Sequence, residues 1–252
     1  MTPAETAQGE ATLRGLLDLV RPDLARAATA MWRSVRTADA YRRWLLTSYD
    51  LVVATAPLLA DALAESVRRG ETELARYFAG QVTEETGHDV WLAEDYAAAG
   101  GDPRDLAGRV PGAAVARLAG AQYYYVRHAH PVALLGHIAV LEWNPPLKGA
   151  AARLAERVGL PREAFRTLAA HAELDLGHGA ALERLLAGLP LDAGRRRLVT
   201  TSALASVRGL VELLAELTAP PVSPAATAAG ETGPDRTRPD RAAPDPTLGA
   251  AP

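Results

Sequence analysis

Residues 168–185 of the chain, LAAHAELDLGHGAALERL, decide its fold. Steps of three and four residues place six of these side chains on one row of a helix. The row consists of Leu168, His171, Asp175, His178, Leu182 and Leu185. Its leucine ends predict burial in a helical bundle, yet its centre holds two imidazoles and a carboxylate. Burying one such group unpaired costs about 2–7 kcal/mol, and a shared metal ion removes that cost. A single histidine here would be typical of a hydrogen-bonded core, whereas three potential ligands on one row favour a metal site.

The composition of the chain limits its class of function. There are 252 residues, a formal net charge of −3 and no cysteine. The balanced charge gives no sign of the basic surface that binds nucleic acid. The lack of cysteine excludes disulfides, thiolate metal sites and cysteine nucleophiles. The first residues, MTPAETAQGE, lack the basic and apolar regions of a secretory signal, and no apolar run reaches the ~18 residues of a membrane span. We therefore expect a soluble cytoplasmic protein with no nucleic-acid or membrane partner.

Helical periodicity recurs along most of the chain, and no segment shows convincing strand alternation. Pro22 is expected to kink or divide the first helix, and Pro57 to bend the second. The expected helices cover residues 11–36, 39–69, 71–99, 111–129, 131–143, 148–158, 161–187 and 192–217. The sequence thus predicts a single all-α domain at 11–219, between a disordered leader at 1–10 and a disordered Pro/Ala-rich tail at 220–252.

The helix expected at 71–99 has a second apolar row with a polar centre. Glu85 and His88 stand three residues apart on this row, which also contains Leu74 and Leu92. Glu84 lies beside the row, so Glu85 is the preferred inward carboxylate and Glu84 the alternative. A solvated acidic patch would account for both glutamates, but it would not account for a histidine on the apolar row.

A third carboxylate lies at the end of the most apolar helix. Glu142 is the one acidic residue in the segment 131–143. A buried carboxylate needs a cation, hydrogen-bond donors or a proton. His137 lies about 140° away from Glu142 around the helix, so it does not share that face. We interpret His137, His128 and His130 as structural residues or residues at the edge of a pocket.

Together the polar positions supply three imidazoles and three carboxylates from three helices. This set suits iron or manganese, because structural zinc favours thiolates while calcium and magnesium prefer oxygen ligands. Six ligands suit two metal ions that leave room for dioxygen. His171 and His178 are ~10 Å apart along the helix and would bind different ions. Gly87 and Gly177 precede two of the histidines, either to let the helix distort for metal entry or to allow close packing.

A ferritin-like bundle is the nearest competing plan. It uses two Glu-x-x-His motifs and one glutamate from each of two further helices. Residues 85–88 fit one motif and residues 175–178 resemble the other. The helix expected at 39–69 offers no well-placed glutamate, and the third histidine, His171, stands in its place.

Three segments resemble the haem-oxygenase-like diiron oxidases, a family also described as iron-containing redox enzymes. The segments are EETGHDVWLAEDYAAAGGDP (84–103), QYYYVRHAHPVALLGHIAVLEWNPP (122–146) and HAELDLGH (171–178). The resemblance spans about residues 40–190 and implies a haem-oxygenase-like helical bundle. The ligands it implies are Glu85, His88, Glu142, His171, Asp175 and His178. Haem binding is disfavoured because no histidine precedes His88, and the thiaminase branch of the fold is disfavoured because there is no cysteine.

The resemblance also implies a reaction. It implies two Fe(II) ions, or a manganese–iron pair, with O2 as co-substrate. The expected enzyme oxidises a small amine, amino acid or carboxylate by N-oxygenation, desaturation or C–C cleavage. Tyr49, Tyr124, Tyr125 and His128 are candidates to line the substrate pocket, and a homodimer is a possible assembly. Two alternatives stay open: a cofactor-independent oxidase of the same fold, and a non-enzymatic helical metal-binding protein.

Overall fold

The computed structural model describes residues 3–219, with side chains from Leu13 onward except those of Asp175 and Leu176. Within this part of the chain the regular elements are helices and there is no strand, which confirms the predicted all-α class. The elements are α1 (Pro3–Ser34), α2 (Ala38–Arg68), α3 (Thr72–Glu85), α4 (His88–Ala98), η1 (Pro103–Leu106), α5 (Ala113–His128), η2 (Pro131–Ala133), α6 (Leu134–Glu142), α7 (Ala150–Val158), η3 (Arg162–Phe165), α8 (Arg166–Gly188) and α9 (Ala193–Thr218). The structure differs from the predicted leader, because α1 already begins at Pro3, and the predicted tail at 220–252 lies outside the described residues.

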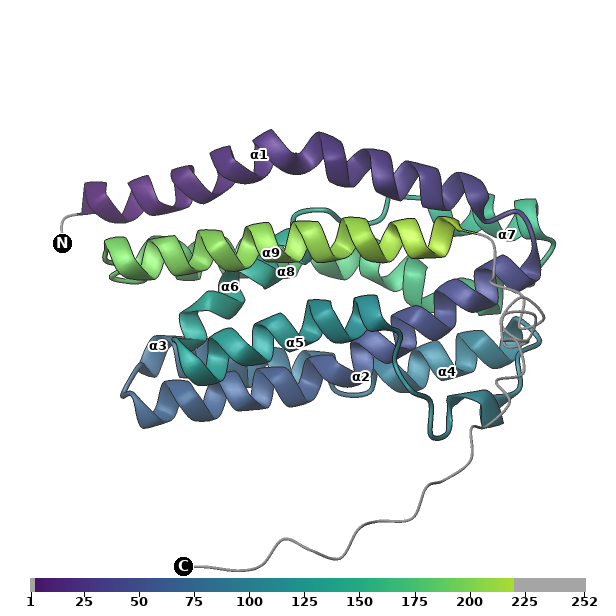
Figure 1. Cartoon of the computed structure of the whole chain (residues 1–252), viewed down its shortest axis with the longest axis horizontal. Coiled ribbons are helices and arrows are strands. Elements are labelled where there is room, and N and C mark those ends of the chain that lie inside the picture. The colour runs from purple at the N-terminus through teal and green to yellow at the C-terminus, as the bar shows by residue number, and fades with distance from the viewer. Residues whose placement is uncertain (1–2, 220–252) are drawn as a thin grey trace, which may run out of the picture. The chain divides into compact units, whose positions relative to one another are not determined.

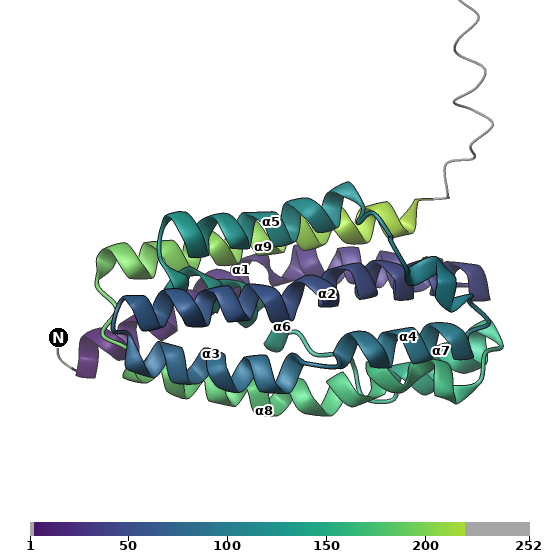
Figure 2. The same cartoon turned by 90° about the horizontal axis from the view of Figure 1, so that it is seen from below.

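The helices pack around α6 (Figures 1 and 2). α1 lies along α9, α2 lies along α3 and α5, and α8 contacts α1, α4 and α6. α6 packs on α9, and all its residues from Leu134 to Val140 are buried. A helix that is buried on all sides must be apolar all round. The most apolar segment of the sequence therefore forms the central helix.

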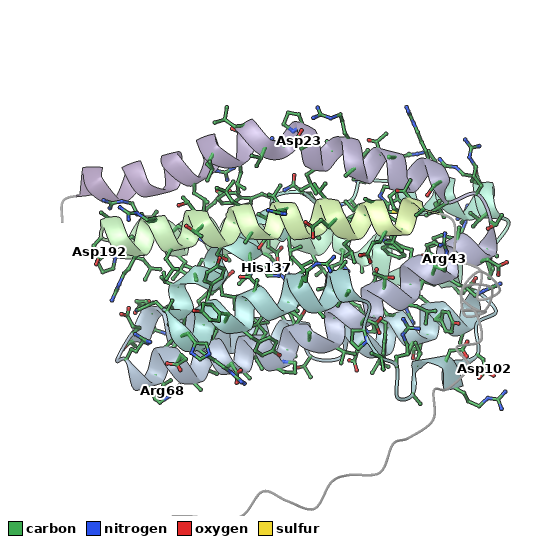
Figure 3. The ribbon with its side chains drawn as sticks, viewed as in Figure 1. Asp23, Arg43, Arg68, Asp102, His137 and Asp192 are labelled. Atoms are coloured by element: carbon green, nitrogen blue, oxygen red, sulfur yellow. The ribbon has the colours of Figure 1, made fainter. Side chains whose placement is uncertain are left out.

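Two long helices continue through an internal proline. Pro22 lies inside α1 and Pro57 lies inside α2. Proline removes one backbone hydrogen bond and crowds the preceding turn, which bends a helix. Figure 3 labels Asp23 at the crest of an arch in α1. Pro22 therefore accompanies a bend in this helix but does not divide it.

The helix expected at 71–99 is in fact two helices, which corrects the sequence prediction. α3 ends at Glu85 and α4 begins at His88. Gly87 between them has a φ of +97°, in the left-handed region that residues with side chains rarely adopt, and Thr86 is extended with a ψ of 122°. The apolar members of the predicted row remain buried on both sides of this break.

The helix that carries the ligand row of residues 168–185 is anchored at its beginning. Phe165 stacks on Tyr41 of α2 with ring centroids 4.2 Å apart, and the Tyr41 hydroxyl donates to the carbonyl of Ala164 at 2.9 Å. The backbone N–H of Thr167 donates to Asp95 Oδ2 at 2.8 Å. Since the first N–H groups of a helix lack intrahelical partners, the buried Asp95 caps α8 from α4. These contacts hold the start of α8 against α2 and α4.

α6 approaches α9 closely at Gly136. A Cβ atom at this position would lie 2.0 Å from the carbonyl oxygen of Val199 and 2.8 Å from the backbone nitrogen of Ala203. These are backbone atoms of a packed helix, and they cannot rotate away as a flexible side chain can. The absence of a side chain at Gly136 therefore lets α6 lie directly on α9, with His137 as the next residue.

We expect Gly136→Ala to destabilise the fold by about 1–3 kcal/mol, because the added methyl group must push α6 away from α9. Gly120→Ala in α5 is the matched control, since its Cβ atom would meet nothing within 4 Å. Alanine is also the better helix former there, by up to about 1 kcal/mol. Chemical denaturation measures both effects, and a Gly136→Ala variant as stable as the wild type would contradict the close contact.

α9 is long and apolar enough to cross a membrane when length and composition alone are considered. Helices buried in a protein core pass the same test. Here α9 packs along α1, α5 and α6, and it buries Ser202 and Ser206. The expected absence of a membrane partner and the cytoplasmic location stay predictions from the sequence.

Candidate metal centre

Three of the predicted ligands come together at one place. Glu85 ends α3, Glu142 ends α6 and His178 lies in α8. One potential ligand atom from each of them lies within 4.8 Å of the other two. The three side chains are only 10–13% exposed. Two carboxylates this close and this buried are stabilised by a cation between them.

The contacts of His178 separate the two candidate glutamates of α3. Its Nδ1 lies 3.4 Å from Glu142 Oε2, and its Nε2 lies 3.3 Å from Glu84 Oε2. The side chain of Glu84 is 49% exposed, whereas that of Glu85 is 13% exposed. Glu85 is therefore the buried carboxylate within the group of three, and Glu84 contacts His178 from the rim.

His88 and His171 adjoin the group formed by Glu85, Glu142 and His178. His88 Nδ1 is 3.0 Å from Glu85 Oε2, and the rings of His88 and His171 meet edge to face with centroids 5.0 Å apart. Burial opposes ionisation of Glu85, but the hydrogen bond from His88 and the two imidazoles of α8 hold its pKa below the usual range. Glu85 is thus a carboxylate at neutral pH, the form that binds metal.

The ring of His171 is oriented by its own helix. Its Nδ1 lies 2.9 Å from the carbonyl oxygen of Thr167, and a carbonyl only accepts, so Nδ1 carries the hydrogen. This bond leaves Nε2 as the nitrogen with a lone pair, and metal-binding histidines are commonly held in this way. Asp175, the remaining predicted ligand, lies outside the residues whose side chains the structure describes.

The acidic residues of α2 that a ferritin-like site would need are engaged elsewhere. Asp50 accepts two hydrogen bonds from Arg109, at 2.9 and 2.8 Å, and Asp61 accepts two from Arg127, at 2.8 and 2.5 Å. Glu65 forms ion pairs with the two arginines at the end of its own helix. The described carboxylates of the cluster therefore come from α3 and α6 and not from α2.

The structure adds Tyr77 as a neighbour of the cluster that sequence reasoning missed. Its hydroxyl oxygen is buried and has no hydrogen-bond partner among the described residues. Burial, and after it the carboxylates of Glu142, Glu84 and Glu85, raise the pKa of Tyr77, so its hydroxyl is neutral. The four-residue steps from Tyr77 to Gln81 and on to Glu85 were a signal that they share a face of α3.

A cavity of about 310 Å³ adjoins the cluster, with Glu85, Glu142 and His171 in its wall. Most of the remaining wall is apolar and comes from α2 and α6. It includes Trp44, Leu51, Leu58, Leu134, Ile138 and Leu141. Ligand pockets in proteins start at about 300 Å³.

The residues predicted to bind substrate are not among the described residues that line this cavity. Tyr124 is 63% exposed on α5, and its ring lies 5.0 Å from that of His128, which is also exposed. Tyr125 lies beside Tyr124, with ring centroids 6.2 Å apart, and Tyr49 packs against an apolar core cluster. The candidate pocket is therefore built from α2 and α6 instead of from this part of α5.

The side chains present fit iron. The cluster offers carboxylate oxygens and imidazole nitrogens and no thiolate, the mixture that nonhaem iron binds. Glu85 Oε2 lies 3.0 Å from His88 Nδ1, and a potential ligand atom of Glu85 lies within 4.8 Å of one of His178. An adjoining cavity leaves room for further ligands.

Comparison with known proteins gives a consistent result. A family model described as iron-containing redox enzyme matches residues 42–210. A crystal structure of a domain of unknown function with a heme oxygenase-like fold, from Shewanella denitrificans OS217, has 17% identity and a TM-score of 0.64, and the match covers 86% of this chain and 92% of that one. A TenA homolog from Pseudomonas syringae pv. tomato str. DC3000 has 13% identity and a TM-score of 0.60, with 81% and 91% covered. No curated protein matches the chain. The likeness to the Shewanella structure shows that the bundle has the heme oxygenase-like fold, as the sequence resemblance implied.

Proposed function

The chain belongs to the iron-containing redox enzymes, and from that membership we propose that it is a nonhaem diiron oxygenase or oxidase. It would use O2 and two Fe(II) ions, or a manganese–iron pair, to oxidise a small molecule held in the adjoining cavity. The observation that best supports the proposal is that the buried side chains of Glu85, Glu142 and His178 lie close together beside that cavity.

The described side chains divide naturally between two ions. Glu85, Glu142 and His178 would hold one ion, and Glu85 with His88 and His171 would contribute to the other. Asp175 would complete the set, as its place on the predicted row indicates. Bound iron supplies an open site for dioxygen and the electrons that reduce it.

The cavity would hold the substrate next to the metal ligands. Its mostly apolar wall offers water few hydrogen-bond partners, and a molecule that displaced water there would strengthen the electrostatic interactions at the cluster. Because Glu85, Glu142 and His171 lie in the same wall, a molecule in the cavity lies next to the ligands. A small amine, amino acid or carboxylate held there would undergo N-oxygenation, desaturation or C–C cleavage.

We expect anaerobic titration of the metal-free protein with Fe(II) to reach about two ions per chain, the loading expected of six ligands. Because Fe(II) is expected to bind the native state alone, the melting temperature should also rise with iron concentration. For one site with iron at a hundred times its Kd, the native state gains about 2.7 kcal/mol of stability. Glu85→Gln should weaken iron binding more than tenfold, which is the order expected when a ligand charge is lost. Glu84→Gln is the matched control and should bind nearly as the wild type does.

Three outcomes would contradict the proposal. Saturation well below two ions, or an unchanged melting curve at saturating iron, would mean that the cluster is not a preformed diiron site. Oxidation of substrate that survives chelation would favour the cofactor-independent oxidase. Iron binding without dioxygen consumption in the presence of any substrate would favour a non-enzymatic metal-binding protein.

A further inference from the structure

A chain of buried polar side chains ends in the wall of the cavity. His137 of α6 lines the cavity and is 7% exposed, and Figure 3 labels it inside the bundle, close to α9. Its Nδ1 lies 2.8 Å from Ser206 Oγ of α9. Ser206, Ser202 and Gln122 are fully buried. The metal centre described above does not use this histidine.

The hydrogen-bond network fixes which nitrogen of His137 carries the hydrogen. Ser206 Oγ lies 2.8 Å from the backbone carbonyl of Ser202, which only accepts. A hydroxyl has one hydrogen, so Ser206 must accept from its other neighbours. Gln122 Nε2 donates to it at 3.1 Å, and its Oε1 accepts from Ser202 Oγ at 2.8 Å. His137 Nδ1 must therefore carry a hydrogen and donate it to Ser206.

The ring of His137 is neutral at physiological pH. Burial lowers its pKa to about 4. A neutral imidazole holds one hydrogen, and the network places that hydrogen on Nδ1. Nε2 therefore carries a lone pair. Nε2 lies on the edge of the ring away from the hydrogen bond to α9, so it is available to a ligand in the cavity.

The rest of the described cavity wall offers a ligand no positively charged side chain, and its other neutral polar lining residues are Ser48, Thr55, Gln81, Thr167 and His171. Among its described lining residues there is no lysine and no arginine, and the acidic members are Glu85 and Glu142 of the metal centre. An anionic group placed away from the metals would have no counter-ion there. A hydrogen-bond donor, in contrast, would meet the lone pair of His137.

We propose that Nε2 of His137 accepts a hydrogen bond from an O–H or N–H group of the substrate, which is a small and mainly apolar molecule. His137 is then a specificity-determining residue that orients this molecule within the cavity. Only the description of the ligand as a substrate rests on the proposed function. The hydrogen bond itself needs no iron.

The test compares two isomers, 1-octanol and methyl heptyl ether, by calorimetric titration of the metal-free protein. They differ in the presence of a hydroxyl donor and little in apolar surface. We expect the wild type to bind the alcohol about three- to tenfold more tightly, the value of one neutral hydrogen bond. Equal affinity for the two isomers would overturn the proposal. Failure of the iron titration would leave this result untouched, so the two hypotheses fail separately.

Substitution of His137 separates the cavity hydrogen bond from the structural one. In His137→Asn the amide N–H replaces Nδ1 and keeps the bond to Ser206, while the amide oxygen takes the place of Cδ2 and does not reach the position of Nε2. We expect this variant to fold and to bind the two isomers within about twofold of each other. A preference for the alcohol that survives His137→Asn would overturn the proposal.

Two further measurements keep the proposal testable if His137→Asn does not fold. The ¹⁵N shifts of His137 in the wild type should show the hydrogen on Nδ1, and a hydrogen on Nε2 would overturn the proposal. Ser206→Ala removes the acceptor that fixes the tautomer, so the preference for the alcohol should fall. An undiminished preference in Ser206→Ala would count against the network as its cause.

Discussion

His171→Ala is expected to lower iron-dependent dioxygen consumption by more than about a hundredfold, even though Asp175 and His178 remain. Loss of a group that only orients a ligand already costs 10–100-fold, and loss of a ligand should cost more. His171 lies against His88, lines the cavity and presents Nε2 because Nδ1 is held by Thr167. In a ferritin-like site it would be a supporting residue, and its removal would cost no more than about 10–100-fold.

Glu173→Ala is the matched control for this experiment. Glu173 lies two residues further along α8 and is exposed. It should keep the wild-type iron stoichiometry and the wild-type rate of single-turnover oxygen consumption. Near-normal values for His171→Ala, or a collapse for Glu173→Ala, would overturn the ligand assignment. Measuring stoichiometry and rate together also distinguishes a lost metal from a misplaced one.

Acidification is expected to cost the wild type about 3 kcal/mol of folding stability through His137 alone. Its pKa is about 4 in the fold against 6.5 in the unfolded chain, and the cause is burial. Between these values the unfolded chain binds the proton and the native state does not. Stability is therefore complete above about pH 6.5 and falls as the pH drops towards about 4.

His137→Asn isolates this contribution, because asparagine does not titrate and keeps the bond to Ser206. Urea denaturation of both proteins between about pH 7 and pH 4 should give curves that diverge on acidification, with the variant losing less stability. Parallel curves would show that His137 is not buried in a neutral form. Other groups titrate in both proteins and cancel in the difference.

Most of the cluster could be predicted from sequence because its signals are local. Glu142 is the lone acidic residue of a segment apolar enough to be the central helix, and it lies in the cluster. Spacings of three and four residues placed Glu85 with His88 and set His171 and His178 on one row. These arguments need only the helical period and the cost of burying charge.

The rest depended on contacts between distant segments. The tautomer of His137 depends on Ser206, which is 69 residues away in sequence. The cavity wall comes largely from α2, whose lining residues are apolar apart from Ser48 and Thr55. The run of tyrosines at 123–125 resembles a pocket lining, but the helix period turns Tyr124 outward on α5. The break at Gly87 needed backbone angles, because a mid-helix glycine is also compatible with an unbroken helix.

Glu85 and Glu142 are the last residues of α3 and α6, so two helix C-termini meet where the carboxylates meet. Aligned peptide dipoles give each such end about half a negative charge, worth 0.3–1 kcal/mol for a nearby cation at an exposed end and up to about 2 kcal/mol when partly buried. The backbone therefore attracts cations to this place in addition to the side chains, and it repels small anions. Glu85→Gln should accordingly leave a measurable residual affinity for divalent cations, because part of the attracting field comes from the direction of the helices and no side-chain substitution removes it.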